Sequence, residues 1–179
     1  MYFRICREDE VENIKLNGKE SILIRIGCYN DIRTKNLYKE ILYLDIKDVV
    51  FFEYVTIDFE MNLIDNFIKL NNFILENNFD EVIVHCALSI SRSPAIMICI
   101  SKILGCKKIE DFVKEGFSCY SKVIVSYFEQ FDYIKKKCDI GDVIFYNTYR
   151  KKLKVEDDFF VETISNNDEY DLILKKKRY

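Results

Sequence analysis

The sequence predicts an α/β fold, a central and mostly parallel sheet of about four to five strands flanked by helices. Two observations predict it. Short apolar runs rich in branched residues are typical of buried strands, and longer segments with apolar residues at helical spacing alternate with them. Such alternation favours a parallel sheet, because parallel strands need crossover connections that are usually helical. The 179 residues are 49% hydrophobic and 32% charged, a composition typical of globular chains.

Four apolar runs are expected to form strands. Residues 21–27 ("SILIRIG"), 40–46 ("EILYLDI") and 81–86 ("EVIVHC") are three of them, and residues 2–6 ("YFRIC") are the candidate for a fourth. The first three are short and rich in Ile, Val and Leu, as strands buried on both faces should be.

Four further segments are expected to form helices, residues 61–78, 93–105, 107–116 and 121–137. Residues 61–78 and 121–137 place apolar residues three or four positions apart, which puts them on one helical face, whereas residues 93–105 are predicted to form a buried helix. In the second helix, Pro94 suits the first turn and Gly105 suits the end, since proline lacks a donor that the first turn does not use and glycine tolerates a left-handed cap.

The chain is predicted to divide into a main domain, residues 1–138, and a C-terminal extension, residues 139–179. The extension is rich in charge yet keeps apolar pairs, so a strand or hairpin, partly packed and with a frayed basic end, is expected. The terminal "KKKRY" could be a localisation or phosphate-binding patch, but a solvated terminus is the favoured interpretation.

Charge and cysteine content limit the partners and the compartment. A net charge of −3 gives no basic surface for nucleic acid, and no apolar run approaches the roughly 20 residues of a membrane span. The chain has seven cysteines, an odd number, and no two of them form a CxxC pair. Its first residues do not have the pattern of a signal peptide. Reduced thiols and a cytoplasmic protein that binds neither nucleic acid nor membrane are therefore expected.

The only histidine and the only proline of the chain bracket a short stretch, "HCALSISRSP". It runs from His85 and Cys86, at the end of a predicted strand, to Pro94 in the next predicted helix. Ligands of parallel α/β sheets bind beyond the carboxyl ends of strands, and a short loop leading into a helix N-terminus presents free backbone N–H groups to an anion. The sequence therefore predicts an anion-binding loop here.

The residue types in this loop suit phosphate chemistry. Arg92 offers a planar fork of donors for two phosphate oxygens, and the same positive surroundings favour the thiolate form of Cys86, which is then a nucleophile. The predicted phosphate-binding residues are Ala87, Leu88, Ser89, Ile90, Ser91 and Arg92. A thiolate below a bound phosphate predicts phosphoryl transfer to sulfur.

"HCALSISRSPA" resembles the signature of cysteine-dependent protein phosphatases, H-C-x-x-G-x-x-R-[S/T], especially the form found in dual-specificity phosphatases. The resemblance, which also includes "ILIRIG" and "LYLDIKDV", covers about residues 1–135 and is closest to the compact bacterial and viral members. It implies a phosphatase of phosphotyrosine, and possibly phosphoserine or phosphothreonine, that acts on a phosphoprotein through a phosphocysteine intermediate. It also implies that no metal or cofactor is required.

The resemblance further implies roles for two neighbours of Cys86 and Arg92. His85 would support the thiolate indirectly, and the Ser93 hydroxyl would hydrogen-bond the sulfur as it leaves during hydrolysis. From the residues alone, His85 could be a packed strand residue and Ser93 a helix cap. The family glycine three residues after the cysteine is Ser89 here, where a side chain adds strain. A pseudophosphatase that only binds phosphopeptides is therefore the alternative.

The signature does not locate the general acid, which should follow a strand parallel to that of Cys86. Asp48 is the favoured candidate, because it lies just past the predicted strand 40–46 and "LDIKDV" resembles the acid loop of the compact phosphatases. Asp58 reads as a cap or first-turn residue of the next helix. Asp45 falls inside the predicted strand, where a structural role is the better interpretation.

Overall fold

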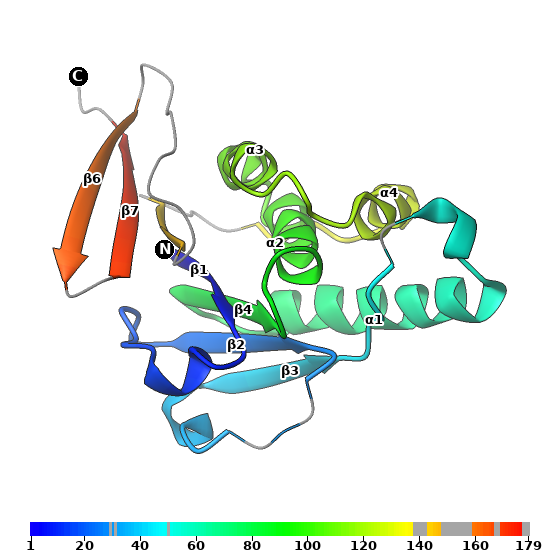
Figure 1. Cartoon of the computed structure of the whole chain (residues 1–179), viewed down its shortest axis with the longest axis horizontal. Coiled ribbons are helices and arrows are strands. Elements are labelled where there is room, and N and C mark those ends of the chain that lie inside the picture. The colour runs from blue at the N-terminus through cyan, green and yellow to red at the C-terminus, as the bar shows by residue number, and fades with distance from the viewer. Residues whose placement is uncertain are drawn as a thin grey trace.

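A computed structural model of the chain describes residues 1–28, 30, 32–49, 51–137, 143–147, 159–166 and 169–176. It has the predicted α/β fold, with helices packed against a sheet (Figure 1). None of the helices in these ranges is long and apolar enough to cross a membrane.

Five parallel strands form the main part of the sheet, in the order β3-β2-β4-β1-β5. Their bounds are Tyr2–Arg7 for β1, Ser21–Ile26 for β2, Glu40–Leu44 for β3, Glu81–Cys86 for β4 and Ile144–Asn147 for β5. The four strands expected from the sequence are confirmed. Strand β4 lies between β2 and β1, so its carboxyl end opens at the centre of one sheet edge.

The four α-helices lie where the apolar spacing predicts them. They are α1 (Ile57–Glu76), α2 (Arg92–Ile103), α3 (Lys107–Gly116) and α4 (Lys122–Gln130). Thr56 caps α1 by accepting a hydrogen bond from the Phe59 N–H, and Gly105, with φ +66°, follows the end of α2. These ends are set by side-chain capping and by the left-handed freedom of glycine.

Helix α4 is shorter than predicted, ending at Gln130 and not at residue 137. The backbone of Ile134 instead pairs with the Asn71 side chain of α1, accepting at 2.8 Å and donating at 2.9 Å. The Lys136 N–H donates to the Ile103 carbonyl at the end of α2. Hydrogen bonds to α1 and α2 thus replace those that would continue the helix.

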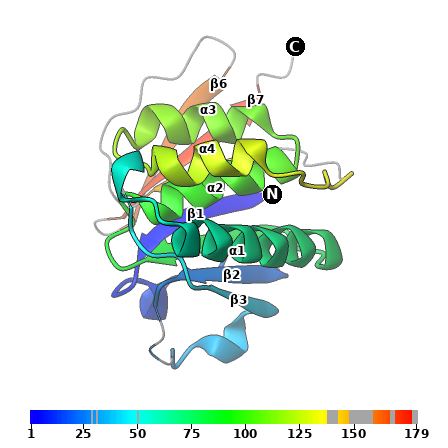
Figure 2. The same cartoon turned by 90° about the vertical axis from the view of Figure 1, so that its right-hand side faces the viewer.

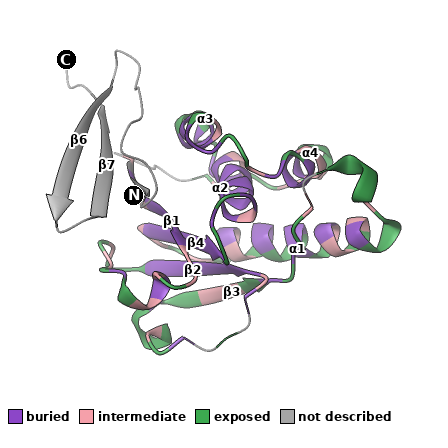
Figure 3. Cartoon of the chain, in the orientation of Figure 1, coloured by how far each residue is buried: buried purple, intermediate pink, exposed green. Residues whose placement is uncertain are grey.

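The two faces of the sheet are covered differently (Figure 3). Buried apolar side chains of all four α-helices form one core cluster with alternate residues of the strands, including Val82, Val84 and Cys86 of β4. The opposite face, which includes Ile83 of β4, is covered by loops and by short 3₁₀ segments such as η1 (Val11–Asn13). The helix layer therefore lies on the same face as the Cys86 side chain.

The C-terminal extension contains an antiparallel hairpin of β6 (Phe159–Asn166) and β7 (Glu169–Lys176), and β7 pairs with β5. A hairpin is what the sequence predicts. The packing of its side chains and the basic end at residues 177–179 lie outside the described residues. The division into two domains at residue 138 stays a prediction.

Candidate active-site loop

Cys86 is the last residue of β4 and is 2% exposed. Six residues later α2 begins at Arg92. Between them the chain turns back over the sulfur, since the Ser89 N–H lies 3.2 Å from the Cys86 Sγ and donates to it. The loop thus places a backbone donor on the sulfur and the N-terminus of a helix shortly after it, and both features stabilise negative charge.

Ser89, which stands where the phosphatase signature has glycine, has a left-handed backbone with φ +54°, alone among the described non-glycine residues. The expectation that this position needs an unusual dihedral is thus confirmed. Its side chain is fully buried, and its hydroxyl donates to the Cys6 carbonyl of β1. This hydrogen bond ties the loop to the neighbouring strand, which offsets part of the strain of a left-handed serine.

Arg92 is held above the ends of β2 and β3. One terminal guanidinium nitrogen donates to the Ile46 carbonyl at 3.1 Å, and its Nε lies 3.9 Å from a carboxylate oxygen of Asp48. Gly27, directly after β2, makes room for it, because a Cβ at this glycine would collide with the guanidinium. Gly27 also has φ +62°, so both its conformation and its missing side chain position the arginine.

Asp48 is the acid that the structure brings to the loop. Its carboxylate accepts a hydrogen bond from the Ser91 hydroxyl at 2.9 Å, and its side chain is 47% exposed.

Asp58 lies in the first turn of α1, as predicted. The prediction that Asp45 falls within the strand is wrong: β3 ends at Leu44 because the side chain of Asn66 binds the backbone of Asp45 and turns the chain.

Ser121 joins three segments at this edge of the sheet. It is 1% exposed, its N–H donates to the Ser91 carbonyl at 3.2 Å, and its hydroxyl donates to the Val49 carbonyl at 2.8 Å. The same hydroxyl caps α4. Ser121 therefore fixes the Cys86 loop and the Asp48 segment relative to each other.

His85 lies under the loop on the sheet face opposite to Cys86, because side chains alternate along a strand. It is fully buried, and its Nε2 accepts from the Nε of Arg25 at 2.9 Å. Burial, and to a smaller extent the Arg25 guanidinium, lower the pKa of His85 from 6.5 to about 3. His85 is therefore neutral, and its proton resides on Nδ1, since Nε2 is the acceptor.

Arg25 holds His85 in place on this face of the sheet. It is 1% exposed, donates also to the Asn30 carbonyl, and lies 3.9 Å from the Glu8 carboxylate. The Arg25 guanidinium thus lies beneath the loop, next to both His85 and the Glu8 carboxylate.

Ser93, in the first turn of α2, is fully buried, and its hydroxyl has no hydrogen-bond partner among the described residues. The first-turn N–H groups of the helix are likewise unused within the helix itself. Buried polar atoms without partners are uncommon in proteins and call for a ligand or a function. The Ser93 hydroxyl is therefore a candidate for contact with a ligand.

Arg25, Gly27 and Ser121 are functional candidates that the motif did not reveal. Two of them left a signal in the sequence, because Arg25 is a charge inside an apolar strand and Gly27 ends that strand in a chain with 5 glycines. Ser121 gives no such signal in the sequence, because its role depends on the backbone carbonyls of Ser91 and Val49, which are distant from it along the chain.

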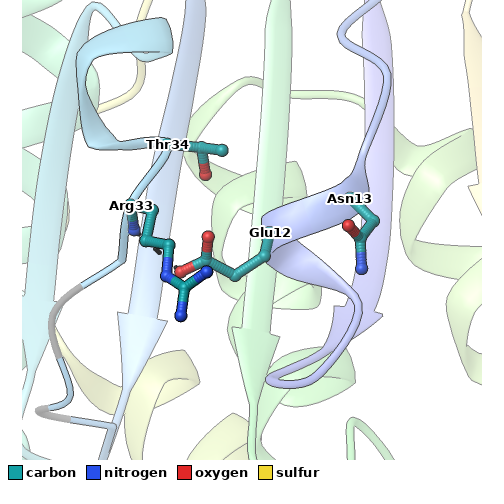
Figure 4. A pocket seen from close by; sticks show the side chains of 4 residues that line it. All are labelled: Glu12, Asn13, Arg33 and Thr34. Atoms are coloured by element: carbon teal, nitrogen blue, oxygen red, sulfur yellow. Dashed lines mark hydrogen bonds between the residues drawn. The ribbon is translucent and has the colours of Figure 1, made fainter.

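A concave site away from the Cys86 loop lies between η1 and the chain after β2, lined by Glu12, Asn13, Arg33 and Thr34 (Figure 4). The Arg33 N–H donates to the Glu12 carboxylate at 2.8 Å. The site is open to solvent and offers no thiol or imidazole, so it does not compete with the Cys86 loop as a catalytic centre.

Within the described ranges, no three His, Cys, Asp or Glu side chains gather as they would around a metal ion.

Comparisons of the chain with models of known protein families, with curated proteins and with solved structures gave no match. The case for a function therefore depends on the sequence and on the geometry of this loop.

Proposed function

We propose that the chain is a protein phosphatase that hydrolyses phosphotyrosine through a phosphocysteine intermediate, with phosphoserine and phosphothreonine as further candidate substrates. The observation that carries the proposal is the loop between β4 and α2. It turns a backbone N–H onto the Cys86 sulfur, begins a helix at Arg92, and brings the carboxylate of Asp48 to Ser91.

In the first step the Cys86 thiolate attacks phosphorus, and the bond between phosphorus and the tyrosine oxygen breaks. Asp48, in its acid form, donates its proton to that oxygen, so that the alcohol leaves uncharged. Arg92 and the loop N–H groups stabilise the charge on the phosphoryl oxygens.

In the second step water attacks the phosphocysteine, the sulfur–phosphorus bond breaks, and Asp48 accepts the proton of the water. The leaving group is the Cys86 thiolate. The Ser93 hydroxyl, which is buried and has no hydrogen-bond partner among the described residues, is the proposed donor to that sulfur.

A substrate with a single phosphoryl group fits this loop best. Between Cys86 and Arg92 the loop carries no lysine that would bind additional phosphates. The six cysteines in the described part of the chain are free thiols, and we place the enzyme in a reducing, cytoplasmic compartment.

Hydrolysis of p-nitrophenyl phosphate in the presence of EDTA tests the proposal. Wild type is expected to hydrolyse it without added metal, and Cys86→Ser is expected to be inactive while still binding phosphopeptides. Cys99→Ser, which changes a fully buried thiol of α2, is the matched control. Binding without turnover in wild type would identify a phosphopeptide-binding module instead, and neither binding nor turnover would reject both.

A further inference from the structure

The surface beside the Cys86 loop is apolar, although it faces solvent. Within the loop, Leu88 is 60% exposed and Ile90 is 46% exposed. After Asp48 the chain continues into η3 (Phe52–Tyr54), where Phe51, Phe52 and Tyr54 are 56%, 54% and 67% exposed. Large apolar side chains that gather in the open mark surfaces that bind a ligand or a partner.

These two groups of side chains lie at the same edge of the sheet. The loop and the segment before η3 are joined directly, since Ser91 donates to Asp48 and Ser121 links the carbonyls of Ser91 and Val49. Figure 2 shows the loop after β4 and the η3 turn on the same side of the molecule. A molecule that places a phosphoryl group above Cys86 therefore meets Leu88 and Ile90 in the loop, and the segment that leads to Phe51 and Phe52 is bonded to the same loop.

The segment that carries these aromatic residues is acidic. Between residues 45 and 60 the chain carries five carboxylates, Asp45, Asp48, Glu53, Asp58 and Glu60, and only Lys47 as a cation. Four of these carboxylates, all but Glu60, belong to exposed residues. A phosphate brings negative charge, so a substrate gains affinity if its own cations face these carboxylates.

We propose that this surface selects phosphopeptides whose residues beside the phosphotyrosine are apolar and basic. The inference rests on the proposed function and adds the substrate class to it. The apolar side chains of the peptide would pack on Phe51, Phe52 and the loop residues Leu88 and Ile90, and its Lys or Arg side chains would face Glu53 and its acidic neighbours.

Four phosphotyrosine decapeptides of equal length test the inference, with flanks that are apolar and basic, apolar and acidic, polar and basic, or polar and acidic. Wild type is expected to show a kcat/KM at least roughly tenfold higher for the apolar and basic peptide than for the polar and acidic one. The double variant Phe51→Ser/Phe52→Ser should lose most of the preference for apolar flanks. Glu53→Lys should lose much of the preference for basic flanks and reduce its dependence on salt.

Leu37→Ser is the matched control, because Leu37 is 59% exposed but lies in η2 (Lys35–Leu37), before β3 begins. It should keep the full preference. Ratios of kcat/KM between peptides are compared within each variant, so a general loss of activity does not imitate a loss of selectivity.

The outcomes separate the two proposals. Equal kcat/KM for all four peptides, or an unchanged preference in the double variant, overturns the inference while phosphatase activity stands. A monomer–dimer equilibrium that the double variant abolishes, without any peptide preference, assigns the surface to a second copy of the chain and also overturns it. If wild type hydrolyses none of the peptides, binding of the same peptides to Cys86→Ser is measured. Selective binding keeps the proposed surface and rejects the phosphatase activity. Absence of binding rejects both proposals.

Discussion

Two sets of side chains alternate in the loop after β4, and their exposure is the reverse of the usual rule. The polar set, Ser89, Ser91 and Ser93, is buried, with exposures of 0%, 9% and 0%, whereas the apolar set, Leu88 and Ile90, is 60% and 46% exposed. Apolar side chains normally fill cores and serines normally face water. The interior of the loop thus carries hydroxyl groups, and its exterior carries the apolar side chains that we propose to contact a peptide.

The difference gives each set its own expected phenotype. Changes in the polar set and in the groups attached to it should affect every substrate, or the stability of the fold. Changes in the apolar set should affect only substrates that extend beyond the phosphoryl group.

The largest effect is expected at Asp48, which is bonded to the polar set through Ser91. Asp48→Ala removes the proposed general acid, and kcat should fall by roughly 10²–10⁴-fold for a phosphotyrosine peptide. The loss should be much smaller for an aryl phosphate whose leaving group needs no proton. Asp58→Ala is the control, and a larger loss there than at Asp48 would transfer the acid to α1.

A smaller effect is expected at Gly27, which gives space to Arg92. Gly27→Ala pushes the guanidinium away, and kcat/KM should fall by roughly 10–10²-fold for small and large substrates alike. Gly105→Ala is matched to it, because both glycines have a positive φ, but a Cβ at Gly105 would meet no atom within 4 Å. Steady-state kinetics of the two variants separate the displacement of Arg92 from backbone strain, and equal losses would contradict the role of Gly27.

Within the loop, stability distinguishes the two sets. Ser89→Ala removes the donor to the Cys6 carbonyl and keeps a side chain at φ +54°, so the free energy of unfolding should drop by about 1–3 kcal/mol. Ser89→Gly loses the same hydrogen bond but relieves the strain, so its loss should be smaller by about 1 kcal/mol. Leu88→Ala should change stability by less than about 0.5 kcal/mol. Urea denaturation measures all three, and a costlier Leu88→Ala would contradict the assignment of the sets.

The smallest effect concerns the layer below the loop. Because the pKa of His85 is about 3 in the folded protein and ordinarily 6.5, the unfolded chain binds an extra proton between these values, and stability falls as the pH drops below 6.5. Between pH 7 and pH 5.5 this amounts to about 1 kcal/mol. His85 is the only histidine, so His85→Gln, which keeps an acceptor for Arg25, should remove most of this slope in urea titrations. An unchanged slope in His85→Gln would assign the pH dependence of stability to other titratable groups.

The sequence was sufficient for the strands, the helices and the position of the loop, because these depend on local apolar patterns and on capping. It was insufficient where tertiary hydrogen bonds decide. Asn71 ends α4 early, Asn66 draws Asp45 out of β3, and Arg25 pairs with His85 from a neighbouring strand. Each of these depends on a polar side chain that meets a distant backbone or side chain.

For the site, the motif located Cys86 and Arg92 but could not show how they are supported. It predicted that a serine at position 89 strains the loop, and the structure adds the hydrogen bond to Cys6 that no spacing rule contains. Asp48 was preferred among three acids from its place after a strand, and its contact with Ser91 fits that preference.

The segment after β3 is held at three points by residues that follow β4. Arg92 binds the carbonyl of Ile46, Ser91 binds the carboxylate of Asp48, and Ser121 binds the carbonyl of Val49. A segment tethered this closely has little freedom to swing like a lid. Under the proposed mechanism, the acid is then in position before the substrate arrives, and turnover should be insensitive to the viscosity of the solvent.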